Sequence, residues 1–297
     1  MIRRALVTGA NGFIGSALLR ACRDFHIIAT GVARVAGIAG NVSSDYSADS
    51  IASLVDRAEA DLLVHAAGSS SVAESMNDPA RDFAASVSLT QRVLEGVRRS
   101  SRRPRILLLS SAAVYGNPNQ LPVSEDAGLA PISAYGYHKA MCEQLLREYV
   151  DCFDLAGTSL RIFSVFGEAQ RKLLVWELFQ RYREKPEVEL MGTGNEERDY
   201  LHVDDLARLI WRSASSPMEL PPVLNVASGT SIRASDLASR IGAALEVRKP
   251  VVCRGISSRR DPVRWRADIS LLRKVIGAPP EHDLERRLRQ LAEAWTR

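Results

Sequence analysis

Tyr135 and Lys139 are the residues of this sequence whose types and spacing are best suited to chemistry. They stand four residues apart in the segment AYGYHK (134–139), and on a helix this spacing places both side chains on one face, about 6 Å apart. A phenol normally loses its proton at about pH 10, and an ammonium group beside it favours the phenolate. The pair is therefore a candidate for proton transfer near neutral pH, although the same spacing also occurs on helices that have no catalytic role.

A glycine-rich turn near the start of the chain is a candidate dinucleotide site. Residues 2–8 are rich in apolar side chains and long enough for a buried strand, and residues 16–23 have apolar side chains at helical spacing. Between them stands GANGFIG (9–15). Glycines at such a junction let the backbone approach a pyrophosphate, and the amides and dipole of the following helix hold the anion.

The strand that the apolar run at 105–110 predicts ends in two hydroxyl residues, Ser110 and Ser111. In open α/β sheets ligands bind at the carboxyl ends of the strands, so Ser111 stands where a substrate oxygen would be bound. The alternative is that its hydroxyl group only satisfies backbone groups at the end of the strand.

The hydrophobic pattern predicts alternating strands and helices in the first half of the chain. The strands are expected at 3–8, 26–33, 62–66, 105–110 and 157–163, and the helices at 13–24, 50–58, 80–99 and 135–150. Such alternation predicts a doubly wound parallel sheet with helices on both faces. After Phe166 the alternation loosens, and helices are expected near 170–184, 204–215, 234–245 and 283–295. We therefore expect a dinucleotide-binding domain at 1–166 and a smaller substrate-binding lobe at 167–297, with Asp204 as the cap of a helix that begins at Asp205.

Composition and charge argue against several other classes of protein. The apolar fraction of 46% is ordinary for a globular protein, and the net charge of +4 is small. The densest basic cluster (98–103) lacks interleaved aromatic residues, so no nucleic-acid partner is expected. Cys22, Cys142, Cys152 and Cys253 have no paired spacing, so neither a metal site nor a disulfide framework is expected. No apolar run reaches membrane-spanning length and the glycine-rich loop leaves no room for a secretory segment, so a cytoplasmic protein without a membrane partner is expected.

Together these segments resemble the extended short-chain dehydrogenase/reductase family, in the branch of NAD-dependent epimerases and dehydratases that modify nucleotide sugars. The matching segments, in the family's order, are TGANGFIG (8–15), LLVHAAG (62–68), SSAAVYG (110–116), YGYHK (135–139), RIFSVFG (161–167) and RDYLHVDDLA (198–207). The resemblance covers nearly the whole chain. It implies a Rossmann-like fold in which parts of the second half return to the first domain. It also implies a homodimer formed through the helices at 80–99 and 135–150.

The resemblance implies a role for each of several residues. Tyr135 is the general acid/base, Lys139 favours its phenolate and bonds the nicotinamide ribose, and Ser111 holds the sugar oxygen that changes between hydroxyl and ketone. The implied cofactor-binding residues are Gly9, Asn11, Gly12, Phe13, Ile14, Gly15, Arg34, Asp45, Ala66, Ala67, Gly68, Tyr135 and Lys139. The implied substrate-binding residues are Ser71, Ser111, Ser164, Arg198 and Arg260, with Arg259 as an alternative to Arg260. Ser164 departs from the family, which commonly has Asn at this position.

The end of the second strand bears on the choice of cofactor. Dinucleotide domains that bind NAD usually carry an acidic residue there, which bonds the ribose 2′-hydroxyl. This strand ends in GVAR (31–34), and Arg34 is suited to a 2′-phosphate. We therefore expect NADP, with NAD as the alternative if Arg34 is a surface residue. Asp45 matches the family position that contacts the adenine, or else it is a turn residue.

Two alanines bear on the reaction. Ala112 and Ala113 occupy the positions where 4,6-dehydratases of the family carry an Asp-Glu pair, and alanine cannot transfer protons, so elimination of water is disfavoured. A 4-keto reductase of a nucleoside-diphosphate hexose is the favoured interpretation, because of the expected NADP and the short second lobe. A 4-epimerase, which normally retains NAD, is the alternative. A non-catalytic NADP-sensing protein is disfavoured because Tyr135 and Lys139 are both present.

Overall fold

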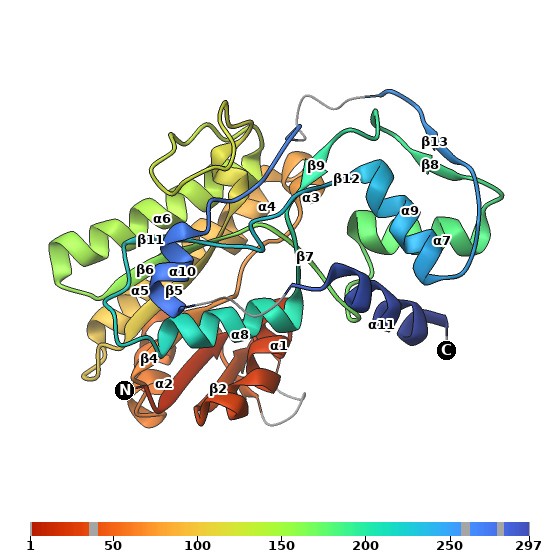
Figure 1. Cartoon of the computed structure of the whole chain (residues 1–297). Coiled ribbons are helices and arrows are strands. Elements are labelled where there is room, and N and C mark those ends of the chain that lie inside the picture. Colours follow the sequence, from red (N-terminus) through yellow and green to blue (C-terminus); the bar gives the residue numbers. More distant parts are fainter. Residues whose placement is uncertain (1, 36–40, 257–261, 278–281, 297) are drawn as a thin grey trace.

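A parallel sheet of seven strands forms the centre of the computed structural model, which describes residues 2–35, 41–256, 262–277 and 282–296 (Figure 1). In spatial order the strands are β11 (Val223–Val226), β6 (Gly157–Ile162), β5 (Arg105–Ser111), β4 (Leu62–His65), β1 (Arg4–Thr8), β2 (Ile28–Ala33) and β3 (Val42–Ser43). All six neighbouring pairs are parallel. The strand order changes direction between β1 and β4, and ligands of such sheets bind at the strand ends beside this point.

Helices cover both faces of the sheet, which explains why its strands are almost continuously apolar. One face is covered by α2 (Ala48–Arg57), α5 (Leu89–Arg99) and α6 (Ala134–Phe153), and the other by α1 (Phe13–Ala21), α8 (Val203–Ala214) and α10 (Ser270–Ile276). Successive strand residues point to opposite faces. Leu6 and Leu63 therefore belong to the core with α2 and α5, whereas Val7 and Val64 belong to the core with α1 and α8.

A smaller lobe lies to one side of the sheet, at the right of Figure 1. It consists of α7 (Leu173–Glu184), α9 (Ala234–Ala244), α11 (Leu284–Thr296) and the pair β8 (Val188–Leu190) and β13 (Val251–Cys253). Its own apolar core includes Phe179, Leu237, Leu288 and Trp295. Two short strand pairs lie between the lobe and the sheet, namely β7 (Ser164–Phe166) with β10 (Tyr200–His202) and β9 (Glu197–Arg198) with β12 (Ile232–Arg233).

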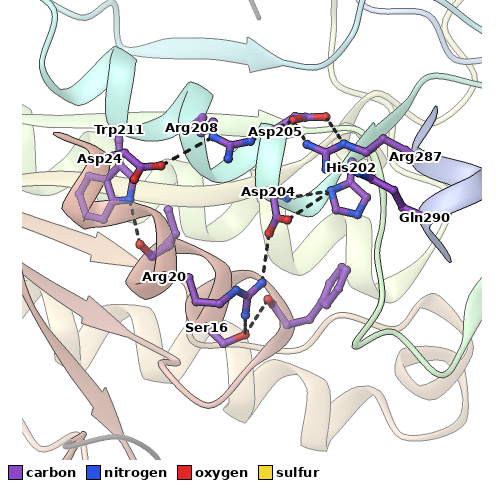
Figure 2. A network of polar contacts seen from close by, with 12 residues as sticks. Ser16, Arg20, Asp24, His202, Asp204, Asp205, Arg208, Trp211, Arg287 and Gln290 are labelled. Atoms are coloured by element: carbon purple, nitrogen blue, oxygen red, sulfur yellow. Dashed lines mark hydrogen bonds and ion pairs between the residues drawn. The ribbon is translucent and has the colours of Figure 1, made fainter. Parts of the chain in front are cut away.

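A network of polar contacts joins α1, α8 and α11 (Figure 2). Arg287 of α11 forms a buried ion pair with Asp205 of α8. On the other side of α8, Asp204 pairs with Arg20 of α1 at 3.1 Å. The helix that follows the glycine-rich loop is thereby connected through α8 to the last helix of the second lobe.

The predicted fold class is confirmed, and the differences lie in short elements. The expected helix at 80–99 is divided into α4 (Pro79–Phe83), a π-helical turn (Ala84–Ser88) and α5, and α3 (Val72–Asn77) precedes it. The prediction that Asp204 caps α8 is wrong, because the helix begins at Val203 and the His202 imidazole accepts the Asp204 amide at 3.3 Å. Although β11 is an edge strand of the central sheet and α8 and α10 pack on it, the division at residue 166 stays a prediction. No helix in the described parts of the chain is long and apolar enough to cross a membrane.

Candidate active site

The glycine-rich loop connects β1 to α1 at the point where the strand order changes direction. Gly9 has φ +70°, and a Cβ atom on it would lie 2.7 Å from the backbone of Ala66 and Ala67. A Cβ atom on Gly15 would lie 2.1 Å from the Gly9 carbonyl oxygen, so both positions require glycine. Gly12 is the N-cap of α1 and provides no side chain to cap the first amides of the helix. These amides and the helix dipole fit the pyrophosphate of a dinucleotide.

The other residues predicted for the loop have packing or hydrogen-bonding roles. Phe13 and Ile14 are half-buried and pack on the apolar core beneath α1. Asn11 donates a hydrogen bond from its side-chain nitrogen to the Val35 carbonyl at 3.1 Å. The loop is therefore held to the segment after β2.

Tyr46 contacts the glycine-rich loop, a role that was not predicted from the sequence. Its buried hydroxyl group accepts the Gly9 amide at 3.1 Å and donates to the Val32 carbonyl at 2.8 Å, so it joins the glycine-rich loop to the end of β2. Burial raises the pKa of the Tyr46 phenol, which keeps it a hydrogen-bond donor. The contact is tertiary, and its one local signal was an aromatic residue next to Asp45.

Arg34 and Asp45 are exposed at this edge of the sheet. Arg34 directly follows β2, and its carbonyl oxygen accepts the Ser43 hydroxyl at 3.0 Å. The Asp45 carboxylate accepts the Ser47 amide at 2.9 Å, which lowers the pKa of Asp45. Asp45 thus forms a turn, and the adenine contact stays a prediction.

A buried histidine connects β1, β4 and α5. The two ring nitrogens of His65 bond the Thr8 hydroxyl at 2.8 Å and the Thr90 hydroxyl at 3.2 Å, and Thr8 also accepts the Ala67 amide at 3.3 Å. Burial, aided by the charge of Lys139, lowers the pKa of His65 to about 3, so its ring is neutral at physiological pH. Neutral His65 therefore holds together the ends of β1 and β4.

Tyr135 and Lys139 face one another on α6, as their spacing predicted. The Lys139 Nζ atom lies 5.7 Å from the centre of the Tyr135 ring and donates to the Leu109 carbonyl at 2.9 Å. Ser111 follows two residues later at the end of β5. On the other side, a Cβ atom on Gly68 would lie 3.8 Å from Nζ. Lys139 is thus held between the end of β5 and the loop after β4.

A buried ion pair holds α6 to the sheet. Glu143, one helical turn after Lys139, accepts the Ser110 hydroxyl and pairs with Arg161 of β6 at 2.8 Å. Arg161 also donates to the Tyr115 hydroxyl at 3.0 Å. Burial raises the pKa of Tyr115 to about 12, so this phenol stays protonated. This network was not predicted from the sequence, where its one local signal is an acidic residue four positions after Lys139.

Ser111 is followed by a short apolar turn. Its hydroxyl oxygen accepts the Ala113 amide at 3.2 Å, and Ala112 and Ala113 are buried. Neither side chain can transfer a proton, so this turn lacks the second acid and base that elimination requires. Among the described residues, no cluster of His, Cys, Asp or Glu side chains is arranged to hold a metal ion.

The predicted substrate residues lie along the boundary between the two lobes. Ser164 begins β7, and its amide donates to the Asp199 carbonyl at 3.0 Å. The Arg198 guanidinium stacks over the ring of Trp265, 5.4 Å from its centre. Trp265 was not identified from the sequence, because only the fold places it beside Arg198.

Two other predicted substrate residues have different outcomes. Ser71 is buried, and its hydroxyl oxygen caps α3 by accepting the Glu74 amide at 3.2 Å. A substrate contact by Ser71 stays a prediction. Arg260 and its alternative Arg259 lie outside the described residues.

A parallel sheet with a glycine-rich loop at its change of direction, together with Ser111 at the end of β5 and Tyr135 and Lys139 on α6, defines a dinucleotide-dependent enzyme of the short-chain dehydrogenase/reductase type. Residues 5–227 match the model of the NAD dependent epimerase/dehydratase family, and the chain belongs to this family. The family expected from the sequence is thus confirmed.

Several relatives with known names cover most of the chain. The UDP-glucose 4-epimerase of Azospirillum brasilense is 29% identical over 99% of this chain and 92% of its own length. The UDP-glucose 4-epimerase of Mycolicibacterium smegmatis is 30% identical over 82% of each chain. Among solved structures, the UDP-N-acetylglucosamine 4-epimerase of Methanobrevibacter ruminantium, in complex with UDP-N-acetylmuramic acid, is 25% identical. It superimposes with a TM-score of 0.88 over 99% of this chain and 98% of its own.

Proposed function

We propose that this protein is a 4-epimerase of a nucleoside-diphosphate hexose that retains NAD through the catalytic cycle. The observation that carries the proposal is the complete set of Ser111, Tyr135 and Lys139 beside Ala112 and Ala113, which provides proton transfer at one carbon without a second acid and base for elimination. The named 4-epimerases among the relatives support this over the keto reductase that the sequence alone favoured.

The residues of the site fit a nicotinamide dinucleotide. The uncapped first turn of α1 and the close approach of Gly9 to Ala66 suit its pyrophosphate, and in the proposal Lys139 bonds the nicotinamide ribose. When bound, the nicotinamide ring supplies the acceptor and the donor of the hydride at the sugar carbon.

Proton transfer in the proposed reaction belongs to Tyr135. Its phenolate accepts the proton of the sugar C4 hydroxyl, and Ser111 donates a hydrogen bond to the same oxygen. The Lys139 ammonium, fixed by the Leu109 carbonyl, stabilises the phenolate form of Tyr135. After the keto sugar presents its other face, Tyr135 returns the proton to the C4 oxygen, while Arg198 keeps hold of the diphosphate.

The proposal is tested by turnover without added cofactor. Purified protein is incubated with UDP-glucose or UDP-N-acetylglucosamine, the product configuration at C4 is read by NMR, and released nucleotide is identified after denaturation. We expect interconversion of the two C4 epimers and release of NAD. A single reduction that consumes added NADPH would contradict the epimerase.

The keto reductase remains a second candidate because of one observation. No acidic side chain ends β2, and Arg34 follows it at the surface. Guanidinium groups bind phosphate well, so this edge suits the 2′-phosphate of NADP. Dissociation constants of NADH and NADPH decide between the cofactors, with Arg34→Ala as a matched variant. Tighter binding of NADPH that is lost in the variant supports the reductase, and tighter binding of NADH contradicts it.

We also propose that the protein is a homodimer formed through α4 and α6. Tyr137 and Met141 are 53% and 43% exposed and stand one turn apart on α6, and Phe83 of α4 is 41% exposed. The Phe83 ring packs edge-to-face on His138 of α6, so the three apolar side chains share one region. Sedimentation velocity is expected to show a dimer that becomes a monomer on double substitution of Tyr137 and Met141 by Glu. A wild-type monomer would contradict the dimer.

A further inference from the structure

Asp199 is a fully buried carboxylate that takes no part in the proposed proton transfer. Its side chain is 0% exposed and accepts four hydrogen bonds. One carboxylate oxygen accepts the Ser228 amide at 2.9 Å and the Ser228 hydroxyl at 2.6 Å. The other accepts the Gly229 amide at 2.9 Å and the Ala267 amide at 3.2 Å. Burial raises the pKa of Asp199 to about 6, although all four donors favour its charged form.

The four donors belong to segments that are far apart in the sequence. Asp199 itself links β9 to β10, Ser228 and Gly229 follow β11, and Ala267 precedes α10. The main chain of Asp199 adds a further segment, because its carbonyl oxygen accepts the Ser164 amide at 3.0 Å. One residue therefore fixes the relative positions of four strands or loops at the boundary between the lobes.

One of these segments carries Arg198, which is expected to bind the substrate diphosphate, and another carries Trp265, whose ring lies beneath the Arg198 guanidinium. Arg198 is the direct neighbour of Asp199, and its guanidinium stacks on Trp265. Trp265 lies two residues before Ala267, and its amide donates to the Glu197 carbonyl at 3.0 Å. The Trp265 indole nitrogen also donates to the Gly116 carbonyl at 2.8 Å, in the turn that follows Ser111. The Asp199 hydrogen bond to Ala267 thus fixes the backbone that carries the aromatic support of Arg198.

We propose that Asp199 is a positioning residue that sets Arg198, Trp265 and Ser164 as one wall of the nucleoside-diphosphate site, and so controls substrate affinity rather than the chemical step. This inference rests on the proposed function, in which Arg198 binds the diphosphate. Its effect acts through Arg198 and Ser164, because the Asp199 carboxylate is fully bonded inside the protein.

Asp199→Asn tests the proposal in the full-length protein. The substitution keeps the shape of the side chain but replaces one acceptor oxygen by an NH2 group that faces at least one backbone N–H donor in either orientation, so at least one of the four hydrogen bonds is lost. We expect the dissociation constant of UDP, measured by calorimetry, and the KM for the nucleotide sugar to rise about tenfold. The kcat and the dissociation constant of NADH are expected to stay within about twofold, since Tyr135, Lys139 and the glycine-rich loop are untouched.

Two further variants separate positioning from folding. Ser228→Ala removes one donor to Asp199, and we expect the same change in UDP affinity at smaller size, about threefold. Asp268→Asn is the matched control, because it is the same substitution on the segment that carries Ala267, where the carboxylate accepts the Ser270 amide at 2.8 Å at the start of α10. Wild-type UDP affinity is expected in this control.

The outcomes separate the role of Asp199 from the proposed function. If Asp199→Asn and Ser228→Ala lower thermal stability but leave UDP affinity unchanged, the positioning role is wrong and Asp199 only stabilises the fold. A fall in kcat at unchanged KM would also overturn it. If the wild type binds UDP without turning over any nucleotide sugar, the epimerase proposal fails while the UDP measurements still decide the role of Asp199.

Discussion

The cofactor side and the substrate side of the site are assembled in different ways. On the cofactor side, the ends of β1, β2 and β4 are neighbours in the sheet, and the side chains of Tyr46 and His65 join them to the loop at Gly9. On the substrate side, loops that are far apart in the sequence meet around Asp199, which holds the backbone beside Arg198. The first arrangement follows from a parallel sheet alone. The second depends on contacts between loops that are distant in the sequence, so we expect substrate preference to change more readily than cofactor binding and proton transfer.

The largest expected effect falls on the proton-transfer residue of the cofactor side. Tyr135→Phe removes the phenolic oxygen but keeps the ring beside Lys139, and we expect kcat to fall at least ~10²-fold, as is usual for loss of a general acid/base. Binding of NADH and UDP is expected to stay intact. Tyr137→Phe, on the same helix and exposed, is the control for kcat. A near-normal rate in Tyr135→Phe would remove Tyr135 from the mechanism.

Gly15→Ala is expected to weaken the cofactor side without altering the substrate side. The new methyl group would lie 2.1 Å from the Gly9 carbonyl oxygen, so the loop must shift away from its pyrophosphate-binding position. Such overpacking costs about 1–3 kcal/mol, and if the loop bears this cost on binding, the dissociation constant of NADH is expected to rise by about fivefold to a hundredfold. UDP affinity, measured on the same preparation, is expected to match the wild type. Equal losses for both ligands would mean that the two sides are not independent.

The buried histidine makes the stability of the cofactor side depend on pH. The pKa of His65 in the folded protein is about 3, below its ordinary value of 6.5, so the unfolded chain takes up the proton first. His65 therefore contributes its full stability above about pH 6.5, and this contribution is lost as the pH falls toward 3. His202, with a pKa of about 4, acts in the same direction. Urea unfolding between about pH 4 and 8 is expected to show this loss, and His65→Gln to make it less steep. An equally steep loss in the variant would assign the effect to other groups.

The smallest expected effect tests the departure from the family pattern on the substrate side. Ser164→Asn restores the amide side chain that is common in the family, at the position where the Ser164 backbone is fixed by Asp199. One added hydrogen bond to the sugar is expected to lower the KM about threefold, with unchanged affinity for NADH. A loss of NADH binding in this variant would show that the two sides share Ser164.

The predictable part of the fold and site consists of features that are local in the sequence. The glycine-rich loop was predicted from a strand pattern, the segment GANGFIG and a helix pattern in succession. The spacing of Tyr135 and Lys139 predicted that both side chains lie on one face of α6. The parallel sheet followed from alternating elements, whereas β3 and α3 are too short to give a clear period.

The remaining site residues act through contacts that no local pattern reports. Tyr46 reaches Gly9 only after β2 and β3 are paired, and Trp265 reaches Arg198 only after the segment before α10 has packed beside β9. Asp199 lies inside RDYLHVDDLA, one of the segments that match the family, yet its proposed positioning role depends on amides contributed by Ser228 and Ala267. Such groups are brought together by tertiary structure, so their burial and partners become visible only in the folded chain.

The dependence of Asp199 on distant donors has a consequence for the order in which the protein matures during synthesis. Chains emerge from the ribosome amino terminus first, and early domains begin to fold while later residues are still being added. The glycine-rich loop, His65 and α6 all precede residue 154, whereas the hydrogen bond from Ala267 to Asp199 cannot form until that late residue has emerged. A growing chain is therefore expected to gain its nucleotide-cofactor surface well before its sugar-recognising surface is complete.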